Sequence, residues 1–183
     1  MDPSTFDPGP PAPVNARPEG DGWTLIFVRD LHHPRERVWS ALTDPAVLDR
    51  WAPWSADRDL GATGEVTLTM RAGAEPSPDD EPMTATVTVA DPPSVLEYTL
   101  GGDRIRWELV AAGAGTRLTL RHTVESRDWV PKVAAGWHLC FAVLDRVLAG
   151  EDPGPIRGAE AMGFGWQRLH DAYAERLGIE VGA

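Results

Sequence analysis

The side chains that could carry out chemistry in this chain are few, and they lie where polar and apolar residues alternate. His122 follows Leu118 and Leu120 at every second position, which directs all three side chains to the same face of a strand. Tyr98 occupies a similar inward position on another predicted strand. An imidazole or a phenol among apolar neighbours is a candidate general acid or base. A hydrogen-bonded core histidine is the plainer interpretation of His122, so the sequence leaves catalysis open.

Aromatic side chains are the second group of interest, because the chain contains eight tryptophans. Large rings can line a cavity and offer an indole N–H to a ligand, or they can simply fill a packed core. Five tryptophans fall at predicted inward positions, namely Trp39, Trp51, Trp107, Trp137 and Trp166, whereas Trp54 and Trp129 flank predicted loops and are candidates for the rim of an opening. The candidate cavity residues are therefore Trp39, Trp51, Trp54, Met70, Tyr98, Trp107, His122, Trp137 and Phe141.

Other kinds of site have little support in the sequence. His138 and Cys140 diverge by about 200° around a helix, and no metal-ligand spacing such as His-Xaa-Xaa-Xaa-His occurs. Glycine-rich phosphate loops and a nucleophile elbow are also missing, so we expect neither a metal ion nor a cofactor. The lone cysteine, Cys140, has the context of a small buried hydrophobic residue.

Charge limits the choice of partners. The chain carries 28 acidic and 17 basic residues, and its formal net charge of −11 disfavours nucleic-acid binding. Four arginines, Arg104, Arg106, Arg117 and Arg121, fall on predicted outer strand faces, where we expect them to pair with acids such as Glu108. A register shifted by one residue would instead turn them toward the cavity and favour an anionic ligand.

The elements that must position these residues follow a clear order. A strand over residues 24–30 leads to a helix opened by Pro34 and to a second short helix after Asp44. Five alternating strands follow between residues 66 and 124, and residues 55–60 are a further candidate, which gives six or seven strands in all. A long helix begins at Pro131 and stops at Gly150, and another helical pattern spans about 159–177.

The ends of the chain set the expected domain limits. Residues 1–20 are rich in proline and poor in apolar residues, which predicts a disordered tail. Residues 21–178 then form a single domain that includes the extra helix at about 159–177. Because no apolar run approaches the roughly 18 residues of a membrane span, and no secretory leader opens the chain, we expect a cytoplasmic protein.

The order of these elements resembles that of a known superfamily. The first strand leads through Pro34 and the Val38-Trp39 helix into Leu42-Thr-Asp-Pro45 and a second helix that ends at Trp51, which is similar to the START-like (SRPBCC, Bet v 1-like) proteins. The late Gly136-Trp137 helix is similar to the family named after the heat-shock protein 90 ATPase activator homologues. The resemblance covers residues 22–150. It implies an α+β helix-grip fold, in which a curved antiparallel sheet wraps a long C-terminal helix and encloses an apolar cavity.

Three functions are compatible with this resemblance. The first is binding of a hydrophobic or amphipathic small molecule, such as a lipid, a polyketide or a steroid-like compound, between the sheet and the long helix. The second is a polyketide cyclase- or hydrolase-like enzyme that uses His122 or Tyr98 in the same cavity. The third is activation of a chaperone ATPase, against which we count the lack of room for the additional amino-terminal domain of the full eukaryotic activators. An exposed edge strand or the extra helix could pair in a homodimer.

Overall fold

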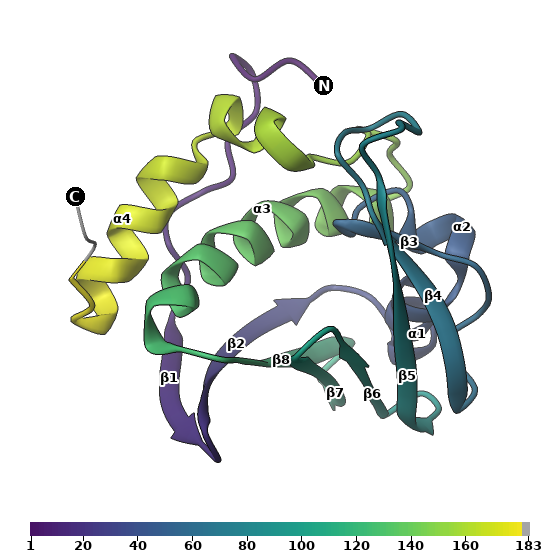
Figure 1. The fold of residues 1–183 in the computed structure, drawn as a ribbon. Coiled ribbons are helices and arrows are strands. Elements are labelled where there is room, and N and C mark those ends of the chain that lie inside the picture. The colour runs from purple at the N-terminus through teal and green to yellow at the C-terminus, as the bar shows by residue number, and fades with distance from the viewer. Residues whose placement is uncertain (181–183) are drawn as a thin grey trace.

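Eight antiparallel strands form one curved sheet in the computed structural model, which describes residues 1–180. The spatial order is β1-β2-β8-β7-β6-β5-β4-β3, so β1 and β3 form the two edges. The strands are β1 (Val14–Glu19), β2 (Gly22–Leu31), β3 (Trp54–Ala56), β4 (Gly64–Met70), β5 (Glu81–Asp91), β6 (Val95–Leu100), β7 (Asp103–Ala112) and β8 (Gly115–Val124). The sheet curls around a long helix, as Figure 1 shows, and this α+β arrangement is the helix-grip fold that the sequence predicts.

Strict alternation gives the sheet its two faces. On β8 the side chains of Leu118, Leu120 and His122 are buried, whereas the intervening residues are at least partly exposed. Neighbouring side chains of a strand point to opposite faces of the sheet, so an alternating sequence specifies one solvent-exposed face and one buried face. The concave face therefore holds the apolar side chains that surround the long helix.

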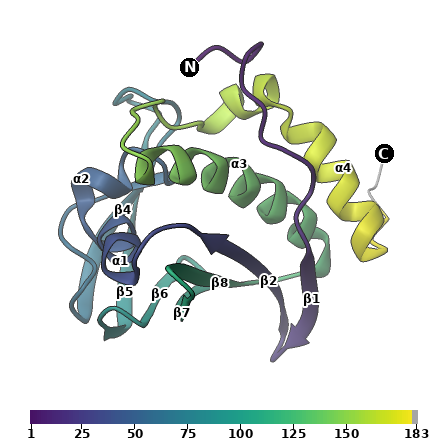
Figure 2. The ribbon, with the colours of Figure 1, turned by 180° about the vertical axis from the view of Figure 1, so that it is seen from behind.

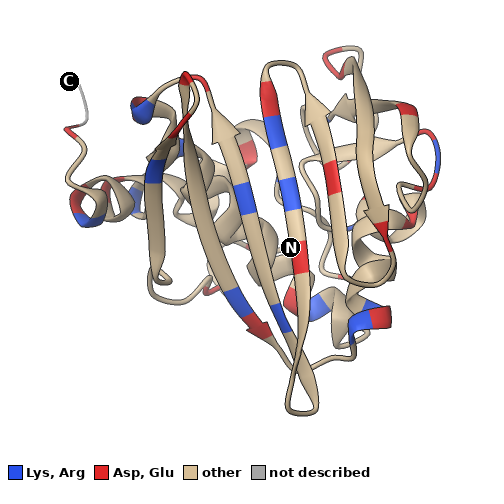
Figure 3. Cartoon of the chain, turned by 90° about the horizontal axis from the view of Figure 1, so that it is seen from below, with Lys and Arg blue, Asp and Glu red and all other residues tan. Residues whose placement is uncertain are grey.

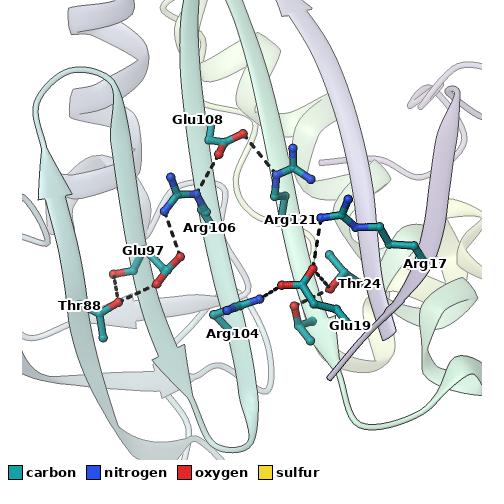
Figure 4. Close-up of polar contacts among 10 residues, drawn as sticks. Arg17, Glu19, Thr24, Thr88, Glu97, Arg104, Arg106, Glu108 and Arg121 are labelled. Carbon is teal, nitrogen blue, oxygen red and sulfur yellow. Dashed lines mark hydrogen bonds and ion pairs between the residues drawn. The ribbon is translucent and has the colours of Figure 1, made fainter. Parts of the chain in front are cut away.

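Charged residues lie at neighbouring positions across the strands of the sheet, as the colours in Figure 3 show, and their side chains are at least partly exposed on the convex face. Arg106 on β7 donates to Glu108 at 2.8 Å and to Glu97 on β6 at 3.1 Å, and Arg121 on β8 donates to Glu108 at 3.3 Å. Arg104 pairs separately with Glu19 on the edge strand β1, as Figure 4 shows. Arg117 pairs with Asp30 in the same way. The expected outward placement of these four arginines is confirmed.

Two short helices close one end of the cup. Helix α1 (Arg35–Thr43) begins after Pro34, and α2 (Pro45–Leu48) begins after Asp44, whose carboxylate accepts a hydrogen bond from the Ala46 N–H. Such a side-chain cap satisfies an N–H that the first turn leaves without a partner. Pro34 and the Asp44 cap therefore predicted the two helix starts.

The long helix α3 (Val130–Leu148) is the one that the sheet grips. It follows a 3-10 turn, η1 (Arg127–Trp129), and most of its side chains are buried. Helix α4 (Trp166–Leu177) packs on the outer side of α3 (Figure 1). None of the helices within residues 1–180 is long and apolar enough to span a membrane.

The late helical pattern at 159–177 is interrupted, which corrects the expectation of one continuous helix. Residues Gly158–Phe164 form a 3-10 helix, η2, and Gly165 then adopts a positive φ of 87° before α4 begins. Glycine reaches this left-handed region without the steric cost that other residues incur. A glycine within an apparently periodic stretch thus marks a change of direction here.

The amino-terminal segment also differs from the expected disordered tail over residues 1–20. Val14–Glu19 forms β1 and pairs with Gly22–Phe27 of β2, and the preceding residues run along α3 and α4 (Figure 2). His138 on α3 hydrogen-bonds the Pro8 carbonyl at 2.8 Å, and the Ala12 N–H donates to the Tyr173 hydroxyl at 3.0 Å. An edge strand tolerates proline, and it satisfies the N–H and C=O groups that β2 would otherwise leave open. Composition alone did not reveal these long-range partners.

Candidate ligand-binding cavity

A cavity of about 550 Å³ lies between α3 and the concave face of the sheet. Val133, Gly136, Trp137 and Cys140 recur on α3 at spacings of three and four residues, so they share one face of the helix. The other walls come from the sheet and from the loop before α4, with Trp54, Met70, Met83, Leu100, Asp103, Ile105, His122, Val124, Ile156, Arg157, Ala161 and Trp166 among the lining residues. The volume is in the range of pockets that hold small organic molecules.

His122 lies in the wall of this cavity and uses both ring nitrogens. The Trp137 indole N–H donates to Nδ1 at 2.9 Å, and Nε2 lies 2.8 Å from an Asp103 carboxylate oxygen. An indole nitrogen can only donate, so Nδ1 must be the acceptor and Nε2 carries the proton that it shares with Asp103. The three side chains thus form a fixed chain from α3 through β8 to the start of β7.

This arrangement limits what His122 can do chemically. A general base needs a free lone pair within reach of the substrate, and the only lone pair of this tautomer accepts the Trp137 N–H. The contacts instead suit a histidine that holds the Trp137 ring in a defined orientation against the cavity. The plainer sequence interpretation, a hydrogen-bonded histidine, matches this geometry.

Tyr98, the second candidate for acid or base chemistry, lies behind the cavity wall. It is buried, and its hydroxyl accepts a hydrogen bond from the Trp107 indole at 3.2 Å. Burial raises the pKa of the Tyr98 phenol far above its usual value, against the opposing effect of that hydrogen bond. A phenol that keeps its proton and has no contact with the cavity is a packing residue.

The nine candidate cavity residues separate into three groups. Trp54, Met70, His122 and Trp137 line the cavity. Trp51, Tyr98, Trp107 and Phe141 are buried in the core behind it, where Trp107 and Trp137 pack edge to face with ring centroids 5.2 Å apart. Trp39 on α1 is only half buried and does not line the cavity. Predicted inward positions therefore include both cavity and core, and the sequence did not separate them.

The two tryptophans predicted at the rim of the opening, Trp54 and Trp129, differ in their exposure. Trp129, the last residue of η1, is 46% exposed and lines the cavity at its opening, where the Lys132 ammonium lies 4.4 Å from its ring centroid. Trp54, by contrast, is almost fully buried in the cavity wall. The short strand β3 draws it inward by pairing with β4.

Most lining residues were not predicted from the sequence, and Asp103, Cys140 and Arg157 are the ones that bear on chemistry. Asp103 follows a glycine turn, Cys140 was interpreted as core, and Arg157 lies in a loop rich in proline and glycine. Burial raises the pKa of the Cys140 thiol to about 12, so it stays protonated and is a poor nucleophile. Arg157 is only 2% exposed, although it is a charged residue in a loop. No periodic pattern marks a loop residue of this kind.

Comparisons with known proteins agree with this architecture. Curated proteins gave no match. Among solved structures, CalU16 from Micromonospora echinospora is 22% identical with a TM-score of 0.62, and the alignment covers 89% of this chain and 94% of that one. A conserved protein of unknown function, EF2215 from Enterococcus faecalis, is 19% identical with a TM-score of 0.67 and 89% coverage of both chains. These two likenesses show a shared fold.

A third solved structure is more similar in sequence. The protein encoded by gene BPP1335 from Bordetella parapertussis is 28% identical with a TM-score of 0.65, and 91% of each chain is covered. The profile of a protein family, described as Activator of Hsp90 ATPase homolog 1-like protein, matches residues 32–149, which is more than half of the chain. The chain therefore belongs to the family of Activator of Hsp90 ATPase homolog 1-like proteins, within the START-like superfamily.

Proposed function

We propose that the protein binds a hydrophobic or amphipathic small molecule in the cavity between α3 and the sheet. The observation that carries this proposal is the cavity of about 550 Å³ within the grip of the sheet, with Trp54, Trp137, Val133 and Ile105 among its lining residues. Binding of an apolar molecule there removes its surface from water, which is the main source of affinity in such pockets.

The polar contacts around His122 favour binding over catalysis. Both ring nitrogens are engaged, by Trp137 and by Asp103, so a reaction would require one of these hydrogen bonds to break. A cyclase- or hydrolase-like activity is the second candidate, because His122 and Asp103 both line the cavity. Replacement of His122 by Gln tests it: turnover of an identified substrate that survives the change would exclude His122 as its acid or base.

Native mass spectrometry of the gently purified protein, compared with the denatured protein, tests the proposal without a guess about the ligand. We expect a reproducible adduct that is lost on denaturation and whose mass identifies the class of compound. The matched control is Gly136→Leu, because Gly136 lines the cavity and a Cβ there meets no atom within 4 Å. An adduct that persists at full occupancy in this variant would place the bound molecule outside the cavity.

The family description leaves a chaperone ATPase-activating role as a separate hypothesis, and an ATPase assay with a purified chaperone tests it. Cytoplasmic location and a homodimer also remain predictions, which cell fractionation and light scattering can check. None of these outcomes bears on whether the cavity binds a small molecule.

A further inference from the structure

We propose that the ligand of the cavity is an anion, and that its charged group binds beside the donor cluster formed by Trp54, Arg71 and Arg157. This inference rests on the proposed function, since it assigns the chemical class of the molecule in the same cavity. The molecule expected is an apolar body that ends in a carboxylate or a similar anionic group.

The first observation is an imbalance between donors and acceptors. Within residues 1–180, the buried side-chain atoms that have no hydrogen-bond partner are Trp54 Nε1, Arg71 Nε and Arg157 Nη1. All three are N–H groups, and no buried side-chain oxygen of this region is left without a partner. Native proteins satisfy nearly all their buried polar groups, so each exception calls for an explanation such as a bound ligand. Three donors without an acceptor call for a ligand group that accepts hydrogen bonds, and an anionic oxygen is the strongest acceptor of this kind.

The second observation is that the three residues that carry these donors lie close together in the fold. Residues 52–54 form the meeting point: the Arg157 Nε–H donates to the Ala52 carbonyl at 2.8 Å, and the Arg71 backbone N–H donates to the Pro53 carbonyl at 3.1 Å. Trp54 is the next residue, and both Trp54 and Arg157 line the cavity. The donor cluster is thus one local structure built from the segment that joins α2 to β3, the residue after β4 and the loop before η2. Its two guanidinium groups pair with Asp49 and Asp80, and each keeps one N–H without a partner.

The Arg157 guanidinium is held in a fixed orientation, as is typical of an arginine that binds an anion. Its side chain is fully buried, and Nη2 donates to the Asp49 carbonyl at 2.7 Å and to the Asp49 carboxylate at 3.0 Å. These bonds fix the guanidinium plane and leave Nη1 free of protein partners. Burial lowers the pKa of Arg157, and the nearby Arg71 adds to this effect against the opposing influence of Asp49. The bonded half of the guanidinium holds the other half in place for an anion.

The basic and acidic side chains that line the cavity lie at different places, and we expect this separation to orient the ligand. Arg157 lies near Cys140 on α3, whereas the lining acids Asp103 and Glu125 lie at the start of β7, beside His122, and just after β8. The interval from Val133 to Cys140 spans about 10 Å along the helix axis. We therefore place the anionic group at the Arg157 end, with the apolar body extending toward Trp129 at the opening.

Two fluorescent probes that share one apolar scaffold test the inference. 1-Anilinonaphthalene-8-sulfonate carries a sulfonate, and N-phenyl-1-naphthylamine lacks it. The ratio of their dissociation constants isolates the anionic group, and it is measured in the wild type, in Arg157→Gln and in Trp54→Phe. The net charge of −11 works against anions in general, so a preference for the sulfonate must come from local donors.

We expect Arg157→Gln to shift this ratio at least about tenfold toward the neutral probe, as loss of one charge-assisted hydrogen bond predicts. Trp54→Phe keeps the ring and removes only the N–H, so its shift has the same direction and a smaller size. A ratio that stays within about twofold of the wild type in both folded variants would overturn the inference.

Competition against N-phenyl-1-naphthylamine in the wild type needs no variant, and it decides the question if Arg157→Gln fails to fold. Decanoate should displace the probe at about a tenfold lower concentration than decanol, and equal or weaker displacement would overturn the inference. The outcomes separate the two proposals. Failure of every probe to bind counts against the cavity itself, whereas binding without an anion preference counts against the donor cluster alone.

Discussion

Replacement of Gly136 by Leu should make the protein more stable and abolish ligand binding at the same time. Gly136 lies within α3 and lines the cavity, and a Cβ at this position has no atom within 4 Å. Removing a glycine from a helix interior stabilises by about 1 kcal/mol. Partial burial of the new side chain adds about 1 kcal/mol more, well below the value for a fully buried leucine. The total of about 2 kcal/mol corresponds to a rise in Tm of about 4–8 °C for a domain of this size.

Thermal unfolding and titration with N-phenyl-1-naphthylamine measure the two effects in parallel. Gly136→Ala is the matched control, because it supplies the helix propensity and fills little of the cavity. We expect it to gain about 1 kcal/mol and to bind the probe as the wild type does. The reasoning fails if Gly136→Leu loses stability, since the space would then be filled, or if it binds the probe with unchanged affinity, since the site would then lie elsewhere.

Three further predictions concern buried polar groups around α3. Burial lowers the pKa of His138 below its ordinary 6.5, so the unfolded chain takes up the proton first and the free energy of unfolding falls as the pH drops below about 6.5. Urea titrations should show this fall, and an equally steep fall in His138→Gln would contradict it. Cys140, with a pKa raised to about 12, should react with iodoacetamide at pH 7.5 about a thousandfold more slowly than in urea, and similar rates would refute its burial. Tyr173→Phe removes the hydroxyl that joins His138 to Ala12, so it should cost about 1–3 kcal/mol and expose residues before β1 to proteases, and an unchanged unfolding curve would refute the role of this bridge.

Most of the architecture followed from local patterns in the sequence. Alternation on β8 placed Leu118 and His122 inward and Arg121 outward, because a strand repeats every two residues whatever its neighbours are. Asp44 marked the start of α2 by the same kind of short-range logic. Such patterns depend only on residues within one element, so they can be interpreted without knowledge of the tertiary structure.

The cavity was harder to predict, because its lining depends on contacts between distant segments. Trp107 and Trp137 have equally inward positions in the sequence, yet only Trp137 lines the cavity, since the position of α3 across the sheet decides which ring faces the space. Arg157 owes its burial to Asp49 and Ala52, which are more than a hundred residues away in the chain. The strand β1 was missed for the same reason, because its pairing with β2 outweighs its composition.

A crystal structure of the protein with bound N-phenyl-1-naphthylamine would test the central claim most directly. We predict electron density for the probe between α3 and the sheet, in contact with Trp137 and Val133. Density confined to the outer surface, or side chains that have closed the space beside Gly136, would contradict the account.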